Sequence, residues 1–472
     1  MNNKAKNLFR NLRYTISANL SILIISVVLN LFVPRILGIK EYSYWQLYVF
    51  YSSYVGFLHF GWLDGIYLKI GGEEYDNLDK VSLNVQFWYL FVSQIFIAFG
   101  IVLYVLLRHD SGEKSLILLC TAVVTIITNL RMFILYIFQS TNRIKEYANL
   151  SRFDRYIYIV FIFIYLFLGG RSFVVLAVSD IFSRLIVTLW GIYQINDIVF
   201  NKVKRGKKYF SEILENIKIG SNLMISNIAS MLIIGITRLL VENKWDIETF
   251  GKLSFTLSIS NMFMTFINAV GIVIFPLLRR TNRSNLKILY EQIRTVFVPL
   301  TFSLLLFFNP IRIILENWLP AYKDSLRFMG VLFPMVIYEG RMSLLINTYL
   351  KTIRKEKYIL LANMASLLLT IVLSVITIFY FNNIDLVVLG IMICLAFRCI
   401  LAELLLSKVL EINIVGNLIQ EIIITIIFIV SNMLLSNLVS FILFLICFSI
   451  YIAINTNKIK VSFKQLVSAI RG

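Results

Sequence analysis

Seven arginines lie inside long apolar stretches of the sequence, where an unpaired charge is costly: Arg131, Arg184, Arg238, Arg312, Arg327, Arg341 and Arg398. Placing an arginine at the middle of a bilayer costs at least about 2.5–3.5 kcal/mol on insertion scales, so such residues face a protein interior or a wet cavity. A guanidinium binds carboxylates and phosphates through paired hydrogen bonds. The chemistry open to these residues is therefore ion pairing or the binding of an anionic ligand.

Two of these arginines have an acid nearby in the sequence. Asp180 precedes Arg184 by four residues, and this spacing predicts an ion pair along one helix. Glu403 follows Arg398 by five residues, which is a poorer geometry for pairing. For Arg184 and Arg398, structural ion pairing and a place in a ligand-binding cavity are equally weighted hypotheses.

Arg131 and Arg341 lack such an acid and are the preferred ligand residues. No acid lies within a turn of Arg131, and Glu339 near Arg341 points to a different side of its helix. The sequence therefore predicts that Arg131 and Arg341 take their counter-charge from water, another span or an anionic ligand. Arg238, Arg312 and Arg327 lie near span ends, where a long side chain reaches the interface, and are interpreted as structural.

Other polar residues of the apolar stretches give weaker signals. Asp180 and Glu339 are the candidates for binding a coupling cation, although each has an arginine nearby. Tyr51 and Tyr54 belong to an aromatic stripe whose rings and hydroxyls could contact sugars, with ordinary packing as the alternative. Asp64, one turn after His59, is interpreted as a polar residue facing a bundle interior.

The composition shows what must position these residues. Hydrophobic residues make up 59% of the 472-residue chain and charged residues only 15%, and the mean hydropathy is +0.81. These values exclude a soluble enzyme and a disordered scaffold. The chain is predicted to be an all-α polytopic membrane protein with about fourteen transmembrane helices, at 14–33, 44–63, 85–107, 115–138, 153–170, 172–195, 219–241, 253–278, 295–315, 326–350, 359–381, 386–407, 417–434 and 438–455.

Loop charge supports this topology. With the N-terminus in the cytoplasm, 30 of the 45 Lys and Arg residues fall in cytoplasmic segments and eight on the opposite side. Both termini are therefore predicted to be cytoplasmic, and the net charge of +19 indicates topology rather than nucleic-acid binding. The loops on the opposite side are short, so no enzymatic domain is expected there. The four cysteines lie in apolar stretches without metal-ligand spacing, and no metal or cofactor is expected.

An internal repeat indicates two lobes. Arg131-Met132 and Lys145-Glu146 recur 210 residues later as Arg341-Met342 and Lys355-Glu356, an offset of six predicted spans. An even-numbered repeat keeps its orientation in the membrane. The predicted organisation is therefore an N-terminal six-helix lobe (1–200), a basic amphipathic cytoplasmic linker (201–218), a C-terminal six-helix lobe (219–408), two extra helices (409–455) and an amphipathic cytoplasmic tail (456–472).

Several local motifs, and above all the arrangement of twelve plus two spans, resemble a known family. The motifs are a basic N-terminus before a polar-speckled first span, the stretch from Val33 to Gly38, the Gly-Trp-Leu-Asp-Gly segment that begins at Gly61, and Phe138-Gln139-Ser140 after span four. The chain resembles Wzx-type polysaccharide flippases of the multidrug/oligosaccharidyl-lipid/polysaccharide exporter (MOP) superfamily. It departs from them at Tyr42-Ser43-Tyr44, where relatives usually have a Tyr-Gly pair.

The resemblance implies two six-helix lobes around a cavity that opens alternately to either side of the bacterial cytoplasmic membrane. It also implies a substrate, an oligosaccharide linked to polyprenyl diphosphate, and as partners a polysaccharide polymerase and glycosyltransferases. Arg131, Arg341, Arg184, Arg398, Arg35, Tyr51 and Tyr54 are the candidate cavity residues. Three alternatives remain: a cation-coupled multidrug antiporter of the same fold, a membrane polysaccharide polymerase, and a structural membrane protein, which would leave the buried arginines unexplained.

Overall fold

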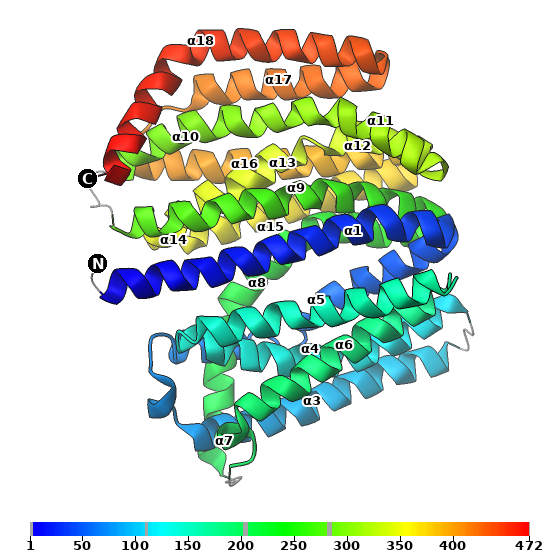
Figure 1. The fold of residues 1–472 in the computed structure, drawn as a ribbon, viewed down its shortest axis with the longest axis vertical. Helices are drawn as coiled ribbons and strands as arrows, with labels where there is room; N and C mark the ends of the chain where they lie inside the picture. Colours follow the sequence, from blue (N-terminus) through cyan, green and yellow to red (C-terminus); the bar gives the residue numbers. More distant parts are fainter. Residues whose placement is uncertain (1–2, 109–111, 202–205, 281–285, 472) are drawn as a thin grey trace. The chain divides into compact units, whose positions relative to one another are not determined.

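The computed structural model describes residues 3–108, 112–201, 206–280 and 286–471, and these residues form helices joined by short connections (Figure 1). The α-helices are α1 (Asn3–Tyr54), α2 (Trp62–Lys69), α3 (Lys80–Leu107), α4 (Glu113–Ser140), α5 (Ile144–Phe167), α6 (Phe173–Gln194), α7 (Asn196–Val199), α8 (Lys207–Lys244), α9 (Ile247–Arg280), α10 (Leu286–Ser303), α11 (Phe308–Trp318), α12 (Leu326–Leu332), α13 (Met335–Arg341), α14 (Asn347–Thr352), α15 (Glu356–Val375), α16 (Ile384–Leu410), α17 (Val415–Leu434) and α18 (Asn437–Arg471).

Short 3-10 and π-helical turns connect several of these helices. They are η1 (Val55–Phe57), η2 (Tyr75–Asn77), η4 (Leu304–Phe307), η5 (Pro320–Ser325), η6 (Met342–Ile346) and η7 (Ile376–Tyr380). No strand occurs in the ranges that the structure describes.

The helices confirm the predicted fold class, an all-α polytopic membrane protein. Among the described residues, ten helices are long and apolar enough to cross a membrane, or eleven if one bent pair counts as a span. The predicted spans 14–33 and 44–63 fall on one of these, and the predicted spans 153–170 and 253–278 lie on α5 and α9, which are not among the ten. The number of spans therefore stays a prediction, as does the cytoplasmic placement of both ends.

Helix α1 consists of two helices that meet at a kink, and the predicted first span and the start of the second lie on either side of that kink. Residues 34–43, predicted to form a loop, are helical apart from a kink at Gly38, whose φ of 77° lies in the left-handed region that favours glycine. The predicted second span, 44–63, does not run through as one helix. It leaves the α-helix after Tyr54, and Phe60 and Gly61 both have positive φ before α2 begins.

The predicted span 326–350 is also not a straight helix. It is built from α12, α13, η6 and α14, and the halves on either side of the break are inclined by 45°. The C-terminal half of this broken segment carries Glu339 and Arg341 on α13. A break in a helix frees backbone groups that must find other partners, so such segments are tolerated where protein surrounds them.

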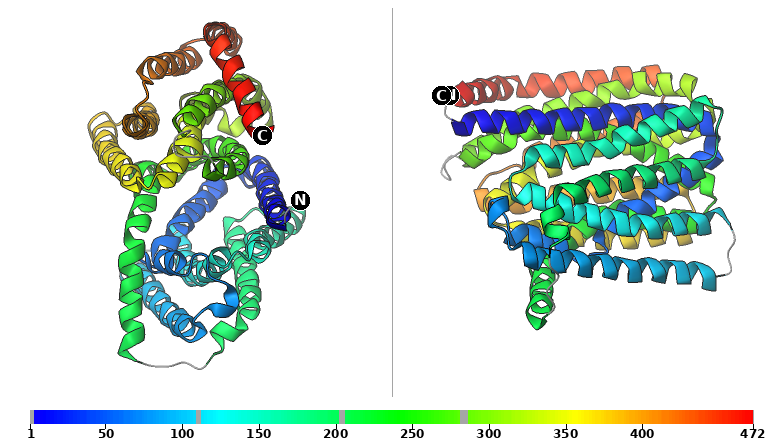
Figure 2. Two further views of the ribbon diagram at one scale, coloured as in Figure 1. Left: turned by 90° about the vertical axis from the view of Figure 1, so that its left-hand side faces the viewer. Right: turned by 60° about the horizontal axis from the view of Figure 1, so that its bottom comes forward.

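The chain divides into two compact units, unit 1 (Met1–Ile228) and unit 2 (Ala229–Gly472). The division falls within α8, which is continuous from Lys207 to Lys244 (Figure 2). Residues 207–228, predicted as linker and as the start of the second lobe, are therefore helical and belong to unit 1. The predicted tail helix is likewise continuous with the last span in α18.

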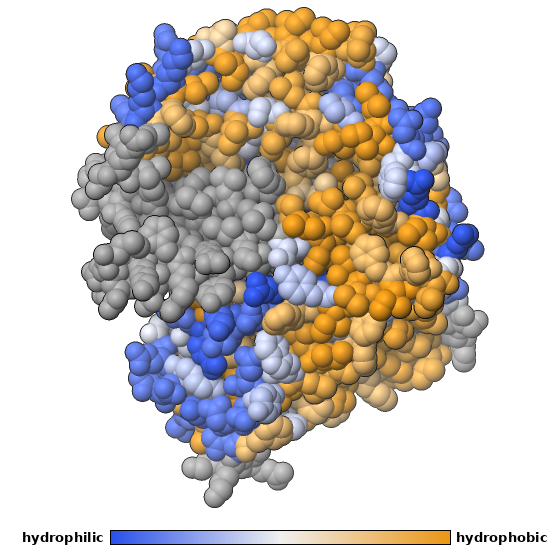
Figure 3. Space-filling view, viewed as in Figure 1, coloured by the Kyte–Doolittle hydropathy of each residue, from blue (hydrophilic) through white to orange (hydrophobic). Residues whose placement is uncertain are grey.

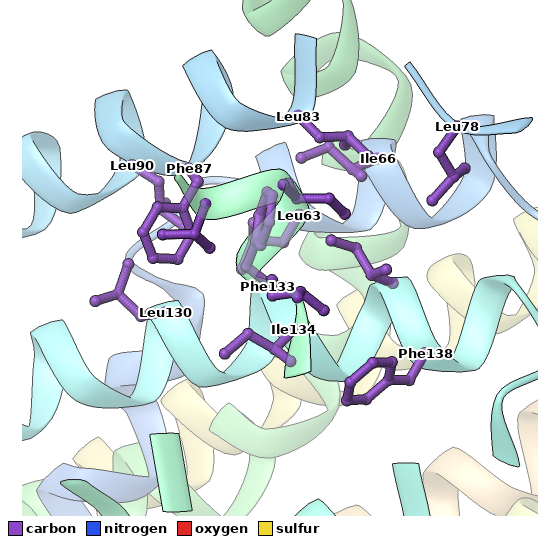
Figure 4. Close-up of a cluster of buried hydrophobic side chains, with 14 of the residues drawn as sticks. Leu63, Ile66, Leu78, Leu83, Phe87, Leu90, Leu130, Phe133, Ile134 and Phe138 are labelled. Carbon is purple, nitrogen blue, oxygen red and sulfur yellow. The ribbon is translucent and has the colours of Figure 1, made fainter. Parts of the chain in front are cut away.

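A hydrophobic core in unit 1 holds α2, α3 and α4 together (Figure 4). Leu63 and Ile66 of α2 pack with Phe87 of α3 and with Phe133 and Ile134 of α4, and all five are buried. Burying a side chain of this size contributes about 1.5–3 kcal/mol, so the core fixes the helices on which the polar residues of unit 1 stand.

Helices α2 and α8 meet through their backbones at this core. A Cβ on Gly65 would lie 1.9 Å from the Asn216 carbonyl oxygen, and a Cβ on Gly220 would lie 2.0 Å from the Gly61 carbonyl oxygen. Only glycine permits so close an approach. The side chain of Asn216 donates to Gln86 Oε1 at 2.8 Å, which also ties α8 to α3.

Unit 2 packs its long helices in neighbouring pairs. Helix α15 lies against α16, and α18 lies against both α10 and α17.

Hydrophobic residues cover the middle of the helices, and hydrophilic residues gather toward their ends (Figure 3). Large apolar side chains on the outer faces, such as Phe96 on α3 and Leu368 on α15, are more than 60% exposed, as expected for surfaces in contact with lipid.

Candidate functional site

Arg131 on α4 has a protein counter-charge that its own helix does not provide. Its Nη1 lies 2.6 Å from Asp154 Oδ2 on α5, and its Nη2 donates to the Leu150 carbonyl at 2.7 Å. The prediction that no acid lies within a turn of Arg131 is correct, and the counter-charge comes from a neighbouring helix 23 residues later. Asp154 falls inside the predicted span 153–170, and an inventory of every acid in the spans would have found it.

The predicted pair between Asp180 and Arg184 is confirmed on α6. Arg184 Nε donates to Asp180 Oδ2 at 2.8 Å, and Tyr48 of α1 donates its hydroxyl to the same oxygen at 2.8 Å. Arg184 also donates to the hydroxyl of Thr128 at 3.3 Å. The carboxylate of Asp180 therefore joins α1 and α6, and it is not an isolated cation ligand.

A third arginine, Arg155 on α5, lies beside both of these pairs. Its Nε is 3.8 Å from Asp154 Oδ2, and its Nη1 is 3.7 Å from Asp180 Oδ1. The Arg155 side chain is 37% exposed, whereas the side chains of Arg131 and Arg184 are 12% and 14% exposed. Arg155 lies close to the predicted start of a span, where an arginine is typical of a cytoplasmic loop charge.

We call these five residues the unit 1 charge cluster: Arg131, Asp154, Arg155, Asp180 and Arg184. Three cations face two anions, so the cluster has a net positive charge. Arg155 is both the most exposed of the three arginines and the one with the longest ion-pair distances. The arrangement can therefore attract an anion while the two tighter pairs keep the helices in place.

Unit 2 contains a second cluster with balanced charge. Arg294 of α10 contacts Glu403 of α16 at 2.8 Å and Glu421 of α17 at 2.9 Å. Arg341 of α13 contacts Glu403 at 3.2 Å and pairs with Glu421 as well. No side chain of this unit 2 charge cluster is more than 5% exposed.

The unit 2 charge cluster shows which of the predicted counter-charges Arg341 has. Arg341 was predicted to need water, a neighbouring span or a ligand, and neighbouring spans supply two carboxylates. Because two arginines face two glutamates, no net charge is left over for an anionic ligand. Arg294 was counted as a loop charge one residue before a predicted span, and the proximity of that boundary was the only signal for it.

Arg398 on α16 does not pair with Glu403, its neighbour in sequence. Its Nη1 contacts Glu339 Oε1 at 2.9 Å, and its Nε donates to Asn363 Oδ1 at 2.8 Å. Five residues along a helix correspond to about 500° of rotation, so the side chains of Arg398 and Glu403 point in different directions. Glu339 is thus a partner of an arginine, as is Asp180, which weakens the prediction that either binds a coupling cation.

The remaining predicted residues lie in unit 1 but outside its charge cluster. Arg35 is exposed on α1 just before the kink at Gly38. Tyr51 and Tyr54 are half-buried, and each ring lies against Phe50, with centroids 5.6 and 5.2 Å apart. Arg131 and Arg341 belong to different units, so their predicted common cavity stays a prediction.

A small polar pocket of about 200 Å³ adjoins the unit 1 charge cluster. Thr128, which accepts a hydrogen bond from Arg184, lines it together with His59, Asp64 and Tyr136. His59 Nε2 lies 3.8 Å from Asp64 Oδ2, and Tyr136 donates to Asp64 Oδ1 at 3.4 Å. Among the buried acids of the described ranges, Asp64 is the one without an ion pair to lysine or arginine.

No group of three or more His, Cys, Asp and Glu residues within the described part of the chain could hold a metal ion.

Comparison with known proteins identifies the fold. No protein-family model matches the chain, and no curated protein matches it. The chain is similar to the solved structure of lipid II flippase MurJ in an inward closed conformation, with a TM-score of 0.67 and 13% identity over 94% of this chain and 99% of that chain.

Other solved structures share this fold. An inward-facing multidrug resistance MATE family transporter of the MOP superfamily has a TM-score of 0.65 and 12% identity over 84% of this chain and 98% of that chain. A MOP superfamily transporter from Pyrococcus furiosus has a TM-score of 0.56 and 12% identity over 86% of this chain and 97% of that chain. The chain therefore has the fold of these membrane transporters.

Proposed function

We propose that this protein moves polyprenyl-diphosphate-linked oligosaccharides across the bacterial cytoplasmic membrane, by alternating access of its two lobes, for the synthesis of surface polysaccharide. The fold supports transport, since solved structures with this fold include a lipid II flippase and multidrug transporters. The short predicted loops and the intramembrane arginines support an anionic substrate rather than a catalysed reaction. The protein acts before a polymerase and after glycosyltransferases in this proposal.

The net positive charge of the unit 1 charge cluster is the observation that carries this proposal. A diphosphate must exchange water for other partners when it crosses the bilayer, and arginine supplies charge with paired donors. Arg155 makes no hydrogen bond within the described residues, and its carboxylate contacts are 3.7 and 3.8 Å long. Its donors can therefore turn to a diphosphate without breaking a tight pair.

The other arginines take different roles in this proposal. Arg131 and Arg184 hold Asp154 and Asp180 and keep the site electropositive, so they position Arg155. Arg341 and Arg398 stabilise unit 2. Arg35, Tyr51 and Tyr54 are proposed contacts for the rest of the headgroup, because each keeps an accessible surface.

Replacement of Arg155 tests the proposal in a host that lacks its own flippase. The measurement is surface polysaccharide, normalised to the amount of protein in the membrane. A charge-assisted hydrogen bond contributes about 1.5–3 kcal/mol, so Arg155→Ala should reduce export by roughly tenfold or more. Arg155→Lys should have an intermediate effect, because the charge stays and the planar fork is lost.

Arg152→Ala is the matched control, since Arg152 lies one turn earlier on α5 and donates to Asn149 at 2.6 Å. It should export normally. Normal export by Arg155→Ala, or an equal loss in both variants, would overturn the anion-binding role of Arg155.

A cation-coupled multidrug antiporter is the second candidate, and Asp64 is the observation that favours it. A buried carboxylate without a lysine or arginine partner can bind a proton or a metal cation. Asp64→Asn should then raise drug sensitivity and leave surface polysaccharide normal. Under the flippase proposal, deletion of this protein instead leaves lipid-linked repeat units in the cytoplasmic leaflet. Loss of a polymerase would leave single repeat units on the outer side of the membrane.

A further inference from the structure

A second pocket, of about 540 Å³, lies in unit 2 where α10, the start of α17 and α18 come together. Its lining includes residues from three segments that the loop charges predict to be cytoplasmic: 279–294, 408–416 and the tail. Nothing in the proposed transport uses this pocket.

The pocket is lined by two side chains of opposite charge. Glu291 of α10 and Lys458 of α18 both line it and are exposed. No ion pair joins them in the part of the chain that the structure describes, which means that their charged atoms are more than 4.0 Å apart. The cation and the anion of a single ligand could therefore be bound at the same time.

The pocket floor adds amide groups beside a buried arginine that is already paired with Glu403 and Glu421. Arg294 is only 4% exposed and lines the pocket while its Nε donates to Glu403. Asn413, Asn417 and Asn457 supply both donors and acceptors. Such a set suits a phosphate oxygen and a primary ammonium better than an apolar ligand.

The rim of the pocket is apolar at Val461 and continues onto exposed apolar side chains. Ile414 and Val461 line the pocket, and Val461 is 54% exposed. Val415 and Ile454, next to lining residues in the sequence or on the same helix, are 52% and 67% exposed. A ligand with a polar head and apolar chains would satisfy both regions, whereas a free small anion would leave the rim uncovered.

We propose that this pocket binds the phosphoethanolamine headgroup of a membrane phospholipid. The phosphate lies near Lys458, the ammonium faces Glu291, and the acyl chains cover the rim. The lipid links α18 to α10, beside the hydrogen bond that Gln292 donates to Gln465 at 2.9 Å. The site belongs to unit 2 and does not depend on what the protein transports.

The test measures lipid binding by the whole protein, purified in a neutral detergent. Native mass spectrometry and thermal unfolding are recorded with phosphatidylethanolamine, with phosphatidylcholine and with soluble glycerophosphoethanolamine. The wild-type protein should bind phosphatidylethanolamine best, because a primary ammonium donates hydrogen bonds to a carboxylate and a quaternary ammonium does not.

Two lining variants should change binding in different ways. Glu291→Gln should remove the preference for phosphatidylethanolamine over phosphatidylcholine. Lys458→Gln should weaken both lipids, by roughly fivefold each, because it removes one cation near the phosphate. Lys460→Gln and Glu411→Gln are the controls, since they remove the same charges from exposed positions that do not line the pocket.

Three results would overturn the proposal. One is an equal affinity of the wild-type protein for the two lipids. Another is an equal effect of the lining and control variants, which would indicate only a diffuse surface field. The third is full stabilisation by soluble glycerophosphoethanolamine, which would make the ligand a small molecule of the cytoplasm.

Discussion

Removing the guanidinium of Arg341 should destabilise unit 2 far more than it impairs any transport step. Arg341 is 1% exposed and lies between Glu403 and Glu421. In the variant Arg341→Met, the remaining Arg294 faces two carboxylates, and the unit 2 charge cluster carries an uncompensated buried negative charge. Methionine fills a similar elongated space, so lost charge rather than lost volume dominates the change.

The expected magnitude follows from that charge. Breaking a buried ion pair by removing one partner costs about 3–5 kcal/mol. For a unit of this size, each kcal/mol corresponds to a shift in Tm of about 2–4 °C, so the Tm should fall by roughly 6–20 °C. The double variant Arg341→Met with Glu421→Gln restores the charge balance around Arg294 and Glu403, and should recover at least half of the loss.

The assay is thermal unfolding of the purified protein in detergent, combined with the yield of monodisperse protein. Arg312→Met is the matched control, because Arg312 pairs with Glu316 at 3.0 Å while both side chains are more than 20% exposed. A pair of this kind contributes about 0–1 kcal/mol, so the control should lose at most a few degrees. An unchanged Tm for Arg341→Met, or a double variant no more stable than the single one, would refute the buried-charge argument.

Three further predictions concern unit 1. Gly65→Ala should separate α2 from α8 and lower the Tm, because the new Cβ would lie 1.9 Å from the Asn216 carbonyl oxygen. Gly100→Ala is the control and should fold normally, because a Cβ at Gly100 would have no atom within 4 Å. Asp180→Asn should reduce the Tm, and Arg184→Gln added to it should restore part of the loss; simple additivity in this double-mutant cycle would show that the two are not coupled. Burial raises the pKa of Asp197, but hydrogen bonds from Lys80 and Tyr75 outweigh burial and hold this pKa below the ordinary value of 3.8. Ionised Asp197 therefore stabilises the fold above that pH, and this contribution is lost as the pH falls through the lower pKa of the folded state. When the Tm is measured as a function of pH, it should fall less steeply below about pH 4 in Asp197→Asn than in the wild-type protein. The same dependence of Tm on pH in both proteins would contradict this.

The helical class and the pair between Asp180 and Arg184 were predictable because both depend on local sequence. Long apolar stretches form spanning helices in lipid since every backbone group must be paired within the segment. An acid four residues before an arginine lies one turn away whatever surrounds the helix. Such signals can be interpreted without knowledge of the tertiary structure.

The other ion pairs join residues on different helices, and sequence spacing does not predict them. Asp154 and Arg131 are 23 residues apart, and Glu421 and Arg341 are 80 residues apart. Which acid reaches which arginine depends on helix rotation and on the order of packing. Arg155 and Arg294 were missed for a simpler reason, because each lies at the predicted border between a loop and a span, where a charge is normally taken as a topology signal.

The kink of α1 and the break after Tyr54 were also beyond the sequence pattern. Apolar periodicity does not show whether residues 34–43 form a loop or belong to two helices that meet at a kink at Gly38. Phe60, a bulky residue, has a positive φ, which such residues rarely adopt, and no local signal in the sequence marks it.

The unit 2 charge cluster also constrains how the protein is made. The ribosome completes Arg294 and Arg341 before Glu403 and Glu421, and the separations along the chain are 109 and 80 residues. At 5–20 residues per second, Arg341 waits roughly 3–12 s for the synthesis of Glu403, the first of its two carboxylate partners along the chain. Arg184, by contrast, follows Asp180 on the same helix and emerges already paired. During the insertion of unit 2, the insertion machinery or a chaperone therefore has to keep two unpaired arginines away from lipid. Chains truncated before α16 should be degraded by membrane quality control.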